Sequence, residues 1–373
     1  MSGIYIHIPF CKKACHYCNF HFSTQLERKN ELVDSIVTEI QWRQDYLQDK
    51  NIETIYLGGG TPSLLSAAEL DKILKAIYDL FNVSPNVEIT LEANPDDLSP
   101  DKLISLKRSG VNRLSIGVQS FFQTDLEYMN RSHNVDQAIS SIDDALGIGF
   151  ENISIDLIYG APTTTDDMWQ DNVTRAIAFG VTHLSCYALT VEPNTALAHF
   201  IKSKKMVAPK DEKAAVQFEY LVKATTKAGW LHYEISNFAK PEMLSQHNTN
   251  YWRGVPYLGI GPAAHSFNGH SRQWNISHNI KYIDYIIQQN KTELYEVEQL
   301  SSTDQTNEYV MTSLRTMWGV DLSHIAPDEH RHKIVSAAKI YLDQDILIQE
   351  GDRLLLSPQA KFLADGIASA LFV

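Results

Sequence analysis

Cysteine is scarce in this chain of 373 residues, which contains 4 cysteines. Three of them stand close together, at Cys11, Cys15 and Cys18, and Cys186 stands alone. Secreted domains use an even set of cysteines as a disulfide framework, whereas three neighbouring cysteines leave one over. The sequence therefore predicts free thiols and a reducing compartment, the cytoplasm.

Long apolar runs and an excess of positive charge are also missing. No apolar run approaches the roughly 20 residues of a membrane-spanning helix, and the N-terminus begins with a strand pattern in place of a signal peptide. Lys and Arg number 32 against 45 Asp and Glu, and the formal net charge of -13 argues against a nucleic-acid-binding surface. With 44% apolar and 21% charged residues, the composition is that of a globular protein with one large domain, or one large and one small domain.

The three neighbouring cysteines lie in a loop directly after a short apolar strand. Residues 5–20 read Y-I-H-I-P-F-C-K-K-A-C-H-Y-C-N-F. Cysteine thiolates hold iron–sulfur clusters, and three of them leave one iron of a cubane cluster open to a small molecule. The alternative from this pattern alone is a structural zinc site whose fourth ligand is His7, His16 or His21.

A second ligand-binding signal follows the next strand. Residues 54–57 form a short apolar strand that runs into Gly58, Gly59, Gly60 and Thr61. Glycines have no Cβ and let a ligand approach the backbone, although such a run is also typical of a tight turn. Because a three-cysteine loop follows the neighbouring strand, the ligand-binding interpretation is favoured.

Strand and helix patterns alternate as far as residue 189. This alternation predicts βα units and a parallel sheet. Six units are fewer than the eight of a closed barrel, so we expect an α/β fold built on a partial (β/α)6 barrel. The expected strands are 4–8, 54–57, 87–92, 113–118, 153–159 and 183–189.

Polar residues fall where these strands end. Glu92 ends the third expected strand, Gln119 ends the fourth and Asp156 lies within the fifth. In parallel βα folds the carboxyl ends of the strands meet at one edge, where ligands bind. We therefore expect these side chains near the cysteine loop and the glycine run.

The pattern loosens beyond residue 210. An irregular segment rich in aromatic residues and glycine precedes a mainly helical part with one hairpin, similar to a winged helix. The acidic balance favours a packing or interaction role for this part over DNA binding. The expected division is a barrel at 1–235, a connecting segment at 236–275 and a C-terminal domain at 276–373.

The motifs together resemble those of a known family. C-x3-C-x2-C with an aromatic residue two places on, followed by G-G-G-T-P, is similar to the radical S-adenosylmethionine (SAM) enzymes. The stretches Y-I-H-I-P-F-C, T-L-E-A-N-P, R-L-S-I-G-V-Q-S-F and I-D-L-I-Y-G-A-P resemble the branch that contains oxygen-independent coproporphyrinogen III dehydrogenase and the HemW heme chaperones. The resemblance covers most of the chain.

This resemblance implies a 4Fe-4S cluster on Cys11, Cys15 and Cys18, with SAM chelating the fourth iron. The backbone of the glycine run would bind the amino group of the methionine part of SAM. Charged side chains would contact the two charged ends of the methionine part, and polar side chains would bind the ribose hydroxyls. The residues alone leave open that Arg131 is a surface charge and Asp156 a buried group that ties strands together. The SAM-binding residues implied are Tyr5, Phe20, Gly58, Gly59, Gly60, Thr61, Glu92, Gln119, Arg131 and Asp156.

A later stretch, His247, Asn248, Tyr251 and Trp252, matches the H-N-x-x-Y-W pattern of the HemW branch. An imidazole is a good axial ligand of heme iron, and flat aromatic rings can stack on a porphyrin. His247 is therefore the expected metal ligand of a bound heme. The residues alone leave an alternative, in which His247 and Asn248 fix a loop while the aromatic rings fill the core.

One departure from the dehydrogenase decides between the two types. That enzyme has a fourth cysteine two residues after the third, and here Phe20 occupies the position. The resemblance thus favours a heme chaperone that delivers heme to a hemoprotein, such as a membrane-bound respiratory cytochrome. The alternatives are coproporphyrinogen III dehydrogenase, a radical SAM oxidative decarboxylase, and a related methylase, so enzymatic activity stays open. The expected partners are heme, the recipient, an electron donor for the cluster and a second copy of the chain, with no nucleic acid.

Overall fold

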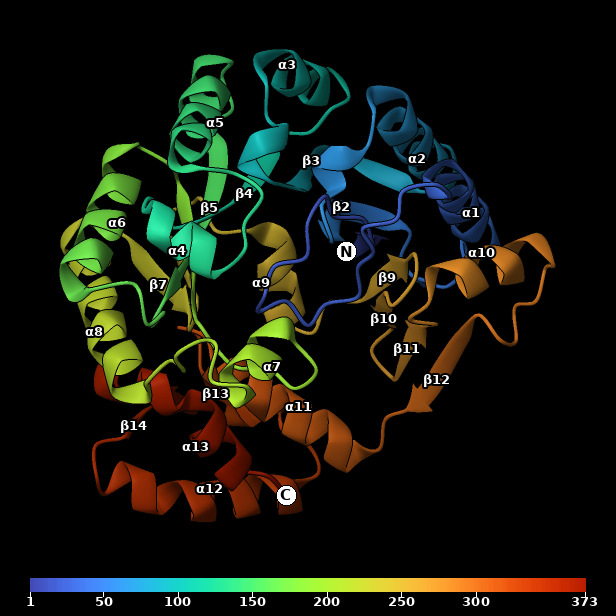
Figure 1. The fold of residues 1–373 in the computed structure, drawn as a ribbon. Helices are drawn as coiled ribbons and strands as arrows, with labels where there is room; N and C mark the ends of the chain where they lie inside the picture. The colour runs from blue at the N-terminus through green and yellow to red at the C-terminus, as the bar shows by residue number, and fades with distance from the viewer.

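A computed structural model describes residues 1–373, and a sheet of parallel strands forms its centre. The first six strands lie side by side, each parallel to its neighbours in this set, and α-helices flank their outer side (Figure 1). The predicted partial (β/α)6 barrel is confirmed. The strands are β1 (Ser2–Ile8), β2 (Asn51–Gly59), β3 (Asn82–Ala93), β4 (Arg113–Gln119), β5 (Asn152–Tyr159) and β6 (His183–Ala188). The helices between them are α1 (Lys29–Trp42), α2 (Ala67–Leu80), α3 (Pro100–Arg108), α4 (Gln123–Tyr128), α5 (Val135–Gly147) and α6 (Asp166–Ala178).

Side-chain alternation separates the inner and outer faces of the strands. On β1, Ile4, Ile6 and Ile8 are buried in the core beneath the helices. Tyr5 lies on the other face, inside the barrel, where its ring stacks on that of Tyr56 from β2. Because a strand presents alternate residues to opposite faces, the apolar series builds the core and the polar series lines the barrel interior.

Local capping agrees with the sequence at α2. The hydroxyl of Ser66 accepts a hydrogen bond from the backbone N–H of Glu69, and the carboxylate of Glu69 accepts one from the backbone N–H of Ser66. This reciprocal arrangement is a capping box, of which a serine followed three residues later by a glutamate is the sequence signature.

Further strands lengthen the sheet at both edges, and four of them lie between residues 236 and 275, where the sequence predicts an irregular segment. The full order is β12-β11-β10-β9-β1-β2-β3-β4-β5-β6-β8-β7. β9 runs parallel to β1, whereas β10, β11 and β12 continue antiparallel. These strands are too short for their periodicity to be recognised. Their bounds are β7 (Leu231–Glu234), β8 (Asn237–Ala239), β9 (Tyr257–Ile260), β10 (His265–Phe267), β11 (Ser271–Asn275) and β12 (Tyr295–Gln299).

The remaining elements form α-helices around the barrel and a small C-terminal module. Helices outside that module are α7 (Ala196–Lys202), α8 (Asp211–Lys227), α9 (Gln246–Trp252) and α10 (Asn279–Ile287). The module contains α11 (Ser302–Leu314), β13 (Val320–Asp321), α12 (Asp328–Leu342), β14 (Leu347–Glu350), β15 (Arg353–Leu356) and α13 (Ala364–Ala370), with its strands in a three-stranded sheet. It is mainly helical, as predicted. No helix of the protein combines the length and the apolar character that crossing a membrane requires.

The domain division at residue 276 stays a prediction, and packing favours a later boundary. The second hydrophobic core begins at Val310 and ends at Leu371. Tyr282, Ile283 and Leu294 belong instead to the core of the large sheet. We therefore place the start of the C-terminal module near residue 300.

A buried ion pair holds the part of the sheet formed by β9, β10 and β11, called the extension below, against α1. The carboxylate of Glu39, which is 0% exposed, accepts hydrogen bonds from Gly261 N–H, Asn275 Nδ2 and the hydroxyl of Tyr282 at 2.7 to 2.8 Å, and lies 3.2 Å from Arg43 Nη1. Such a charge is tolerated in the interior because all of its acceptor capacity is used.

The other side of the same guanidinium reaches the extension. Arg43 donates to the carbonyl of Gly259 at 3.1 Å, to Ser266 Oγ at 3.0 Å and to Gln273 Oε1 at 2.8 Å. One arginine thus joins β9, β10 and β11 to α1. The network fixes one face of this part of the sheet and leaves the opposite face free.

Replacing Arg43 should destabilise the fold strongly. Arg43→Met keeps the apolar stem but leaves the Glu39 carboxylate buried without its cation, and removal of one partner of a buried pair costs about 3 kcal/mol or more. The midpoint of urea unfolding, measured without cofactors, would fall accordingly. Lys223→Met breaks an exposed pair with Glu219 and should cost less than about 0.5 kcal/mol. Equal effects of the two changes would contradict this account.

Candidate functional site

A cavity of about 400 Å³ opens at the carboxyl ends of the barrel strands. The cysteine loop after β1 forms one side of it, and the ends of β2 to β6 form the rest. Its size suits a small-molecule ligand. The sequence-predicted residues that line it are Cys11, Cys15, Cys18, Phe20, Gly59, Gly60, Thr61, Glu92, Gln119, Arg131 and Asp156.

Two of the predicted SAM-binding residues lie just beneath the cavity. The hydroxyl of Tyr5 is 3.0 Å from His7 Nδ1, and its ring stacks on Tyr56 with centroids 6.1 Å apart. A Cβ at Gly58 would lie 3.0 Å from a carboxylate oxygen of Glu92. Gly58 therefore leaves room for Glu92, and direct contact of Tyr5 or Gly58 with a cofactor stays a prediction.

Backbone hydrogen bonds and neighbouring side chains shape the cysteine loop. Cys11 N–H donates to the carbonyl of Ser23 at 3.0 Å, which draws the two ends of the loop together. The hydroxyl of Thr61 donates to Cys11 Sγ at 3.4 Å, and Arg131 Nη1 lies 3.2 Å from Cys15 Sγ. The hydrogen bond from Thr61 favours the anionic form of the Cys11 sulfur, which is the form that binds metal.

Zinc does not match the geometry of this loop. Nowhere in the chain do three or more His, Cys, Asp or Glu side chains converge on one metal-ion position. The imidazoles are engaged elsewhere: His7 lies 2.9 Å from the carbonyl of His21, His16 lies 3.0 Å from the carbonyl of Tyr128, and His21 lies 2.6 Å from Asn279 Oδ1. A tetrahedral zinc ion needs four ligands at one point, whereas a cubane distributes its cysteines over separate irons.

Burial raises the pKa of Cys11 to about 11, and the hydrogen bond from Thr61 only partly offsets this rise. Burial also raises the pKa of Cys18. Both thiols therefore remain protonated at neutral pH unless a bound cation stabilises the thiolates. This donor set fits a cationic iron centre.

The glycine run allows the chain to approach the cavity closely. A Cβ at Gly60 would lie 2.7 Å from the carbonyl oxygen of Phe10 and 2.8 Å from that of Ile8, so a larger residue would displace the cysteine loop. Gly59 has a φ of 108° and donates its N–H to Glu92 at 3.0 Å. β2 continues through Gly58 and Gly59, so these two residues belong to the strand.

Two buried carboxyl groups face the cavity from neighbouring strands. Burial raises the pKa of Glu92 to about 7, although its carboxylate accepts a hydrogen bond from the hydroxyl of Tyr56 at 2.7 Å. Burial likewise raises the pKa of Asp156 to about 6, and Ser115 donates to it at 3.3 Å. An amino group at Glu92 and hydroxyl groups at Asp156 would add further donors to these carboxylate oxygens.

Arg131 and Gln119 complete this edge of the barrel. Arg131 donates to Asn94 Oδ1 at 2.6 Å and to the carbonyl of Gly117 at 2.8 Å, while its Nε is buried without a partner. Gln119 has a φ of 66°, which is uncommon for a residue other than glycine. Strained conformations of this kind concentrate at ligand sites. The side chains of both residues therefore lie where a bound cofactor can contact them.

The structure adds lining residues that the sequence analysis missed. Ser115 and Gly117 follow the inward alternation of β4 and could have been found from it. Tyr17, Asn94 and Tyr187 carried no recognisable signal, because they reach the cavity through loop geometry or from the end of β6. Tyr187 is 45% exposed and faces the cavity.

The H-N-x-x-Y-W residues form α9, which lies within the ring of strands (Figure 1). His247 is 2% exposed, with Nδ1 2.8 Å from Thr54 Oγ1 and Nε2 2.9 Å from the hydroxyl of Tyr251. Its backbone N–H donates to Glu88 at 3.0 Å. Thr54 and Glu88 are inner residues toward the amino ends of β2 and β3. The motif therefore closes the barrel at the end opposite the cysteine loop.

Known proteins resemble this chain over nearly its whole length. The model of the Radical SAM superfamily matches residues 5–176. "Heme chaperone HemW" of Bacillus subtilis is 33% identical over 375 residues, which cover 99% of both chains. The protein of the same name from Mycobacterium tuberculosis is 32% identical over 373 residues, covering 99% of this chain and 94% of that one.

The chain belongs to the HemW family. The chain also matches the Radical SAM superfamily, so its cofactors are a 4Fe-4S cluster and SAM. Among solved structures, coproporphyrinogen III oxidase (HemN) from Escherichia coli has a TM-score of 0.85 over 100% of this chain and 90% of that chain. At 22% identity this likeness shows a common fold and nothing about the reaction.

The residues present fit both cofactors. Three free thiols face the cavity beside glycine backbone, a buried arginine and two buried carboxyl groups. When bound, the cluster and SAM supply one-electron chemistry that generates a radical from the sulfonium. We propose that Cys11, Cys15 and Cys18 hold the cluster, that Glu92 binds the amino group of SAM, and that Asp156 binds its ribose.

Each of the three loop cysteines should be required for iron binding. Cys11→Ala, Cys15→Ala and Cys18→Ala each remove a thiolate ligand, so iron and acid-labile sulfide after anaerobic reconstitution should fall to background. Cys186→Ala is the matched control, because Cys186 is buried on β6 away from the loop and should leave the iron content unchanged. Full iron content in any of the three loop variants would contradict the assignment.

SAM binding should depend on pH through Glu92. A proton on Glu92, whose pKa is about 7, removes the carboxylate that would accept a hydrogen bond from the amino group of SAM. Affinity, measured by anaerobic calorimetry on cluster-loaded protein, should therefore rise between about pH 6 and about pH 7.5. Glu92→Gln should bind SAM more weakly and keep only the part of this dependence that comes from Asp156, whose pKa is about 6. A wild-type affinity that stays flat over the same range would refute the assigned role.

Proposed function

We propose that this protein is a heme chaperone, which binds heme and delivers it to hemoproteins. Membership of the HemW family carries this proposal, because the relatives that match nearly the whole chain are named heme chaperones. The residues His247, Asn248, Tyr251 and Trp252 support it. The reducing cytoplasm is the proposed location, since the cluster depends on free thiols.

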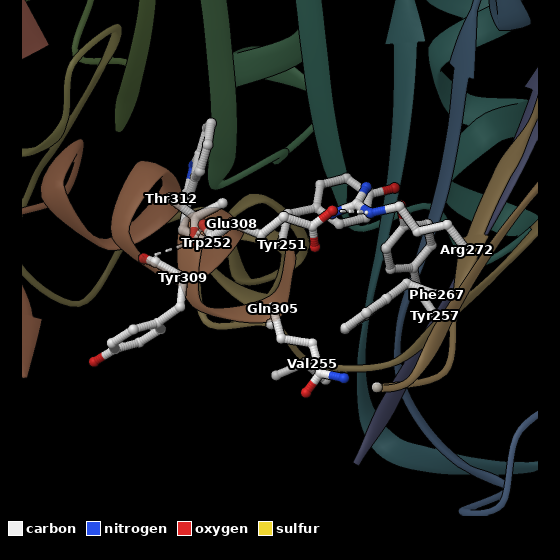
Figure 2. A pocket seen from close by; sticks show the side chains of 12 residues that line it. Tyr251, Trp252, Val255, Tyr257, Phe267, Arg272, Gln305, Glu308, Tyr309 and Thr312 are labelled. Carbon is white, nitrogen blue, oxygen red and sulfur yellow. Dashed lines mark hydrogen bonds and ion pairs between the residues drawn. The ribbon is translucent and has the colours of Figure 1, made fainter. Parts of the chain in front are cut away.

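We place the heme beside the H-N-x-x-Y-W helix, at the seam with the C-terminal module. Tyr251 and Trp252 line a cavity of about 280 Å³ there, between strands that carry Tyr257 and Phe267 and the helix α11 (Figure 2). Aromatic rings provide flat apolar surfaces against which a porphyrin can pack. The motif thus supplies part of the wall of a cavity that is open to solvent.

Iron coordination by His247, which the sequence motif predicts, would require a change in this region. Both of its ring nitrogens are engaged, by Thr54 and Tyr251, and the ring is enclosed. Iron coordination at His247 would therefore require one of these two contacts to break and the ring to become accessible. In the closed arrangement, His247 positions Tyr251, and Asn248 N–H donates to the cap Ser245 at 3.4 Å.

The proposed partners follow from chaperone function. Heme is the cargo, and the recipient is a hemoprotein such as a membrane-bound respiratory cytochrome. An electron donor would reduce the cluster, and a second copy of the chain would form a homodimer. Nucleic acid is not among the proposed partners, because the formal net charge is -13.

Anaerobically reconstituted protein should bind stoichiometric heme and leave coproporphyrinogen III unchanged. Heme titration followed by the porphyrin absorption band measures the first property, and product analysis after incubation with SAM and reductant measures the second. Phe20 offers no thiolate where the dehydrogenase has its fourth cysteine, and its side chain is 70% exposed at the rim of the SAM cavity.

Transfer completes the test. Heme-loaded protein should pass heme to an apo-hemoprotein across a size-exclusion step, while free heme at the same concentration serves as the control. Consumption of coproporphyrinogen without stoichiometric heme binding would replace the proposal with the dehydrogenase. Methyl transfer that uses two molecules of SAM would replace it with a methylase.

A further inference from the structure

A continuous groove separates the antiparallel edge of the large sheet from the C-terminal module. It consists of two adjoining cavities of about 280 and about 580 Å³, which share Arg272, Glu308 and Thr312. Figure 2 shows the first cavity, with α11 on one side and the strands that carry Phe267 and Arg272 on the other. Its residues are distinct from those that line the SAM site.

One face of β9, β10 and β11 forms the floor of this groove. Phe267 pairs with Tyr257 on one side and with Arg272 on the other, and His265 pairs with Trp274. Paired residues share a face of the sheet, and so do alternate residues of one strand. All five side chains therefore lie on the groove face, while the intervening residues face the buried network on α1. The floor is broad, aromatic and held rigidly from behind.

Helix α11 forms the wall that stands over this floor. It contributes Met311 and Thr312, and Phe372 adds an apolar side chain from the end of the chain. The flexible thioether of methionine adapts to apolar ligands of irregular outline. A flat aromatic floor with an adaptable wall suits a planar, largely apolar molecule with one open edge.

His265 gives this groove a potential metal ligand. The residue is exposed, and its ring centroid lies 6.2 Å from that of Trp274. Partial burial and the nearby Arg272 lower the pKa of His265, so the imidazole is neutral and keeps a free lone pair at neutral pH. The enclosed ring of His247, in contrast, spends both nitrogens on hydrogen bonds.

We infer that heme binds in this groove with His265 as an axial ligand of the iron. This inference rests on the proposed chaperone function and identifies its cargo site. The porphyrin packs between the aromatic floor and α11, and Tyr251 and Trp252 border its inner edge. His247 supports that edge from inside the barrel without touching iron.

Charges along the groove favour reversible binding. Arg272 is paired with Glu308 at 2.6 Å, and Glu298 and Asp304 also line the outer cavity. These carboxylates repel the heme propionates and direct them toward solvent. Glu298→Gln removes one such repulsion at the exposed edge and should tighten heme binding.

Heme titration of the full-length, reconstituted protein tests the assignment, with the His265→Ala variant beside wild type. Loss of the ligand should weaken binding by about tenfold or more and shift the porphyrin absorption band. Added free imidazole should restore the wild-type band by occupying the vacated position. The control is His270→Ala, which removes another exposed imidazole from the nearby turn between β10 and β11.

The outcomes separate this inference from the proposed function. Wild-type protein that binds no heme would refute the chaperone proposal itself. Stoichiometric binding that His265→Ala leaves unchanged would refute the groove ligand alone. Loss of binding in His247→Gln with normal binding in His265→Ala would show that the motif histidine is the ligand, and circular dichroism and iron content would check that each variant is folded.

Discussion

The strict alternation of side chains along the parallel strands is the constraint on which the rest of this structure depends. Because every second residue points inward, the inner face of the barrel can be polar while the outer face remains a continuous apolar core. A ring of six strands does not close on itself, so the interior needs cover from other segments. The cysteine loop covers the carboxyl ends, α9 fills the amino ends, and the C-terminal module lies along the open side (Figure 1).

The same alternation explains why one sheet carries two ligand regions. On β1 to β6, inward residues at the carboxyl ends meet the cofactor cavity, where Glu92 and Asp156 are buried. On β9 to β11, that alternation divides the extension into a face locked to α1 by Arg43 and a face turned toward α11. Because the Arg43–Glu39 ion pair fixes these strands on the α1 side, their opposite side forms a rigid floor for the groove beneath α11.

Much of this could be predicted from the sequence, and the reasons for the misses are physical. The six βα units have long, regular apolar patterns, and the cysteine and glycine motifs are local, so their positions at one sheet edge follow from topology. The strands β8 to β10 have three or four residues each, which is too few to show a period of two. The burial of His247 was equally hidden. A histidine in an aromatic stretch has the composition of a ligand site, and only the tertiary fold places Thr54 and Tyr251 at its two nitrogens.

The barrel interior joins the two ends of the molecule through direct contacts. His247 stacks on Tyr56 with ring centroids 5.0 Å apart, and the hydroxyl of Tyr56 donates to Glu92 at 2.7 Å, beside Gly59. Displacement of His247 would remove the surface that holds Tyr56, and with it the hydrogen bond that favours the ionised form of Glu92. The SAM amino group that we propose at Glu92 would donate to the same ionised form and so favour the same position of Tyr56. The bound cofactor and α9 in its place inside the barrel would thus stabilise each other. By thermodynamic linkage, displacement of α9 would weaken cofactor binding, and bound cofactor would oppose that displacement by the same factor.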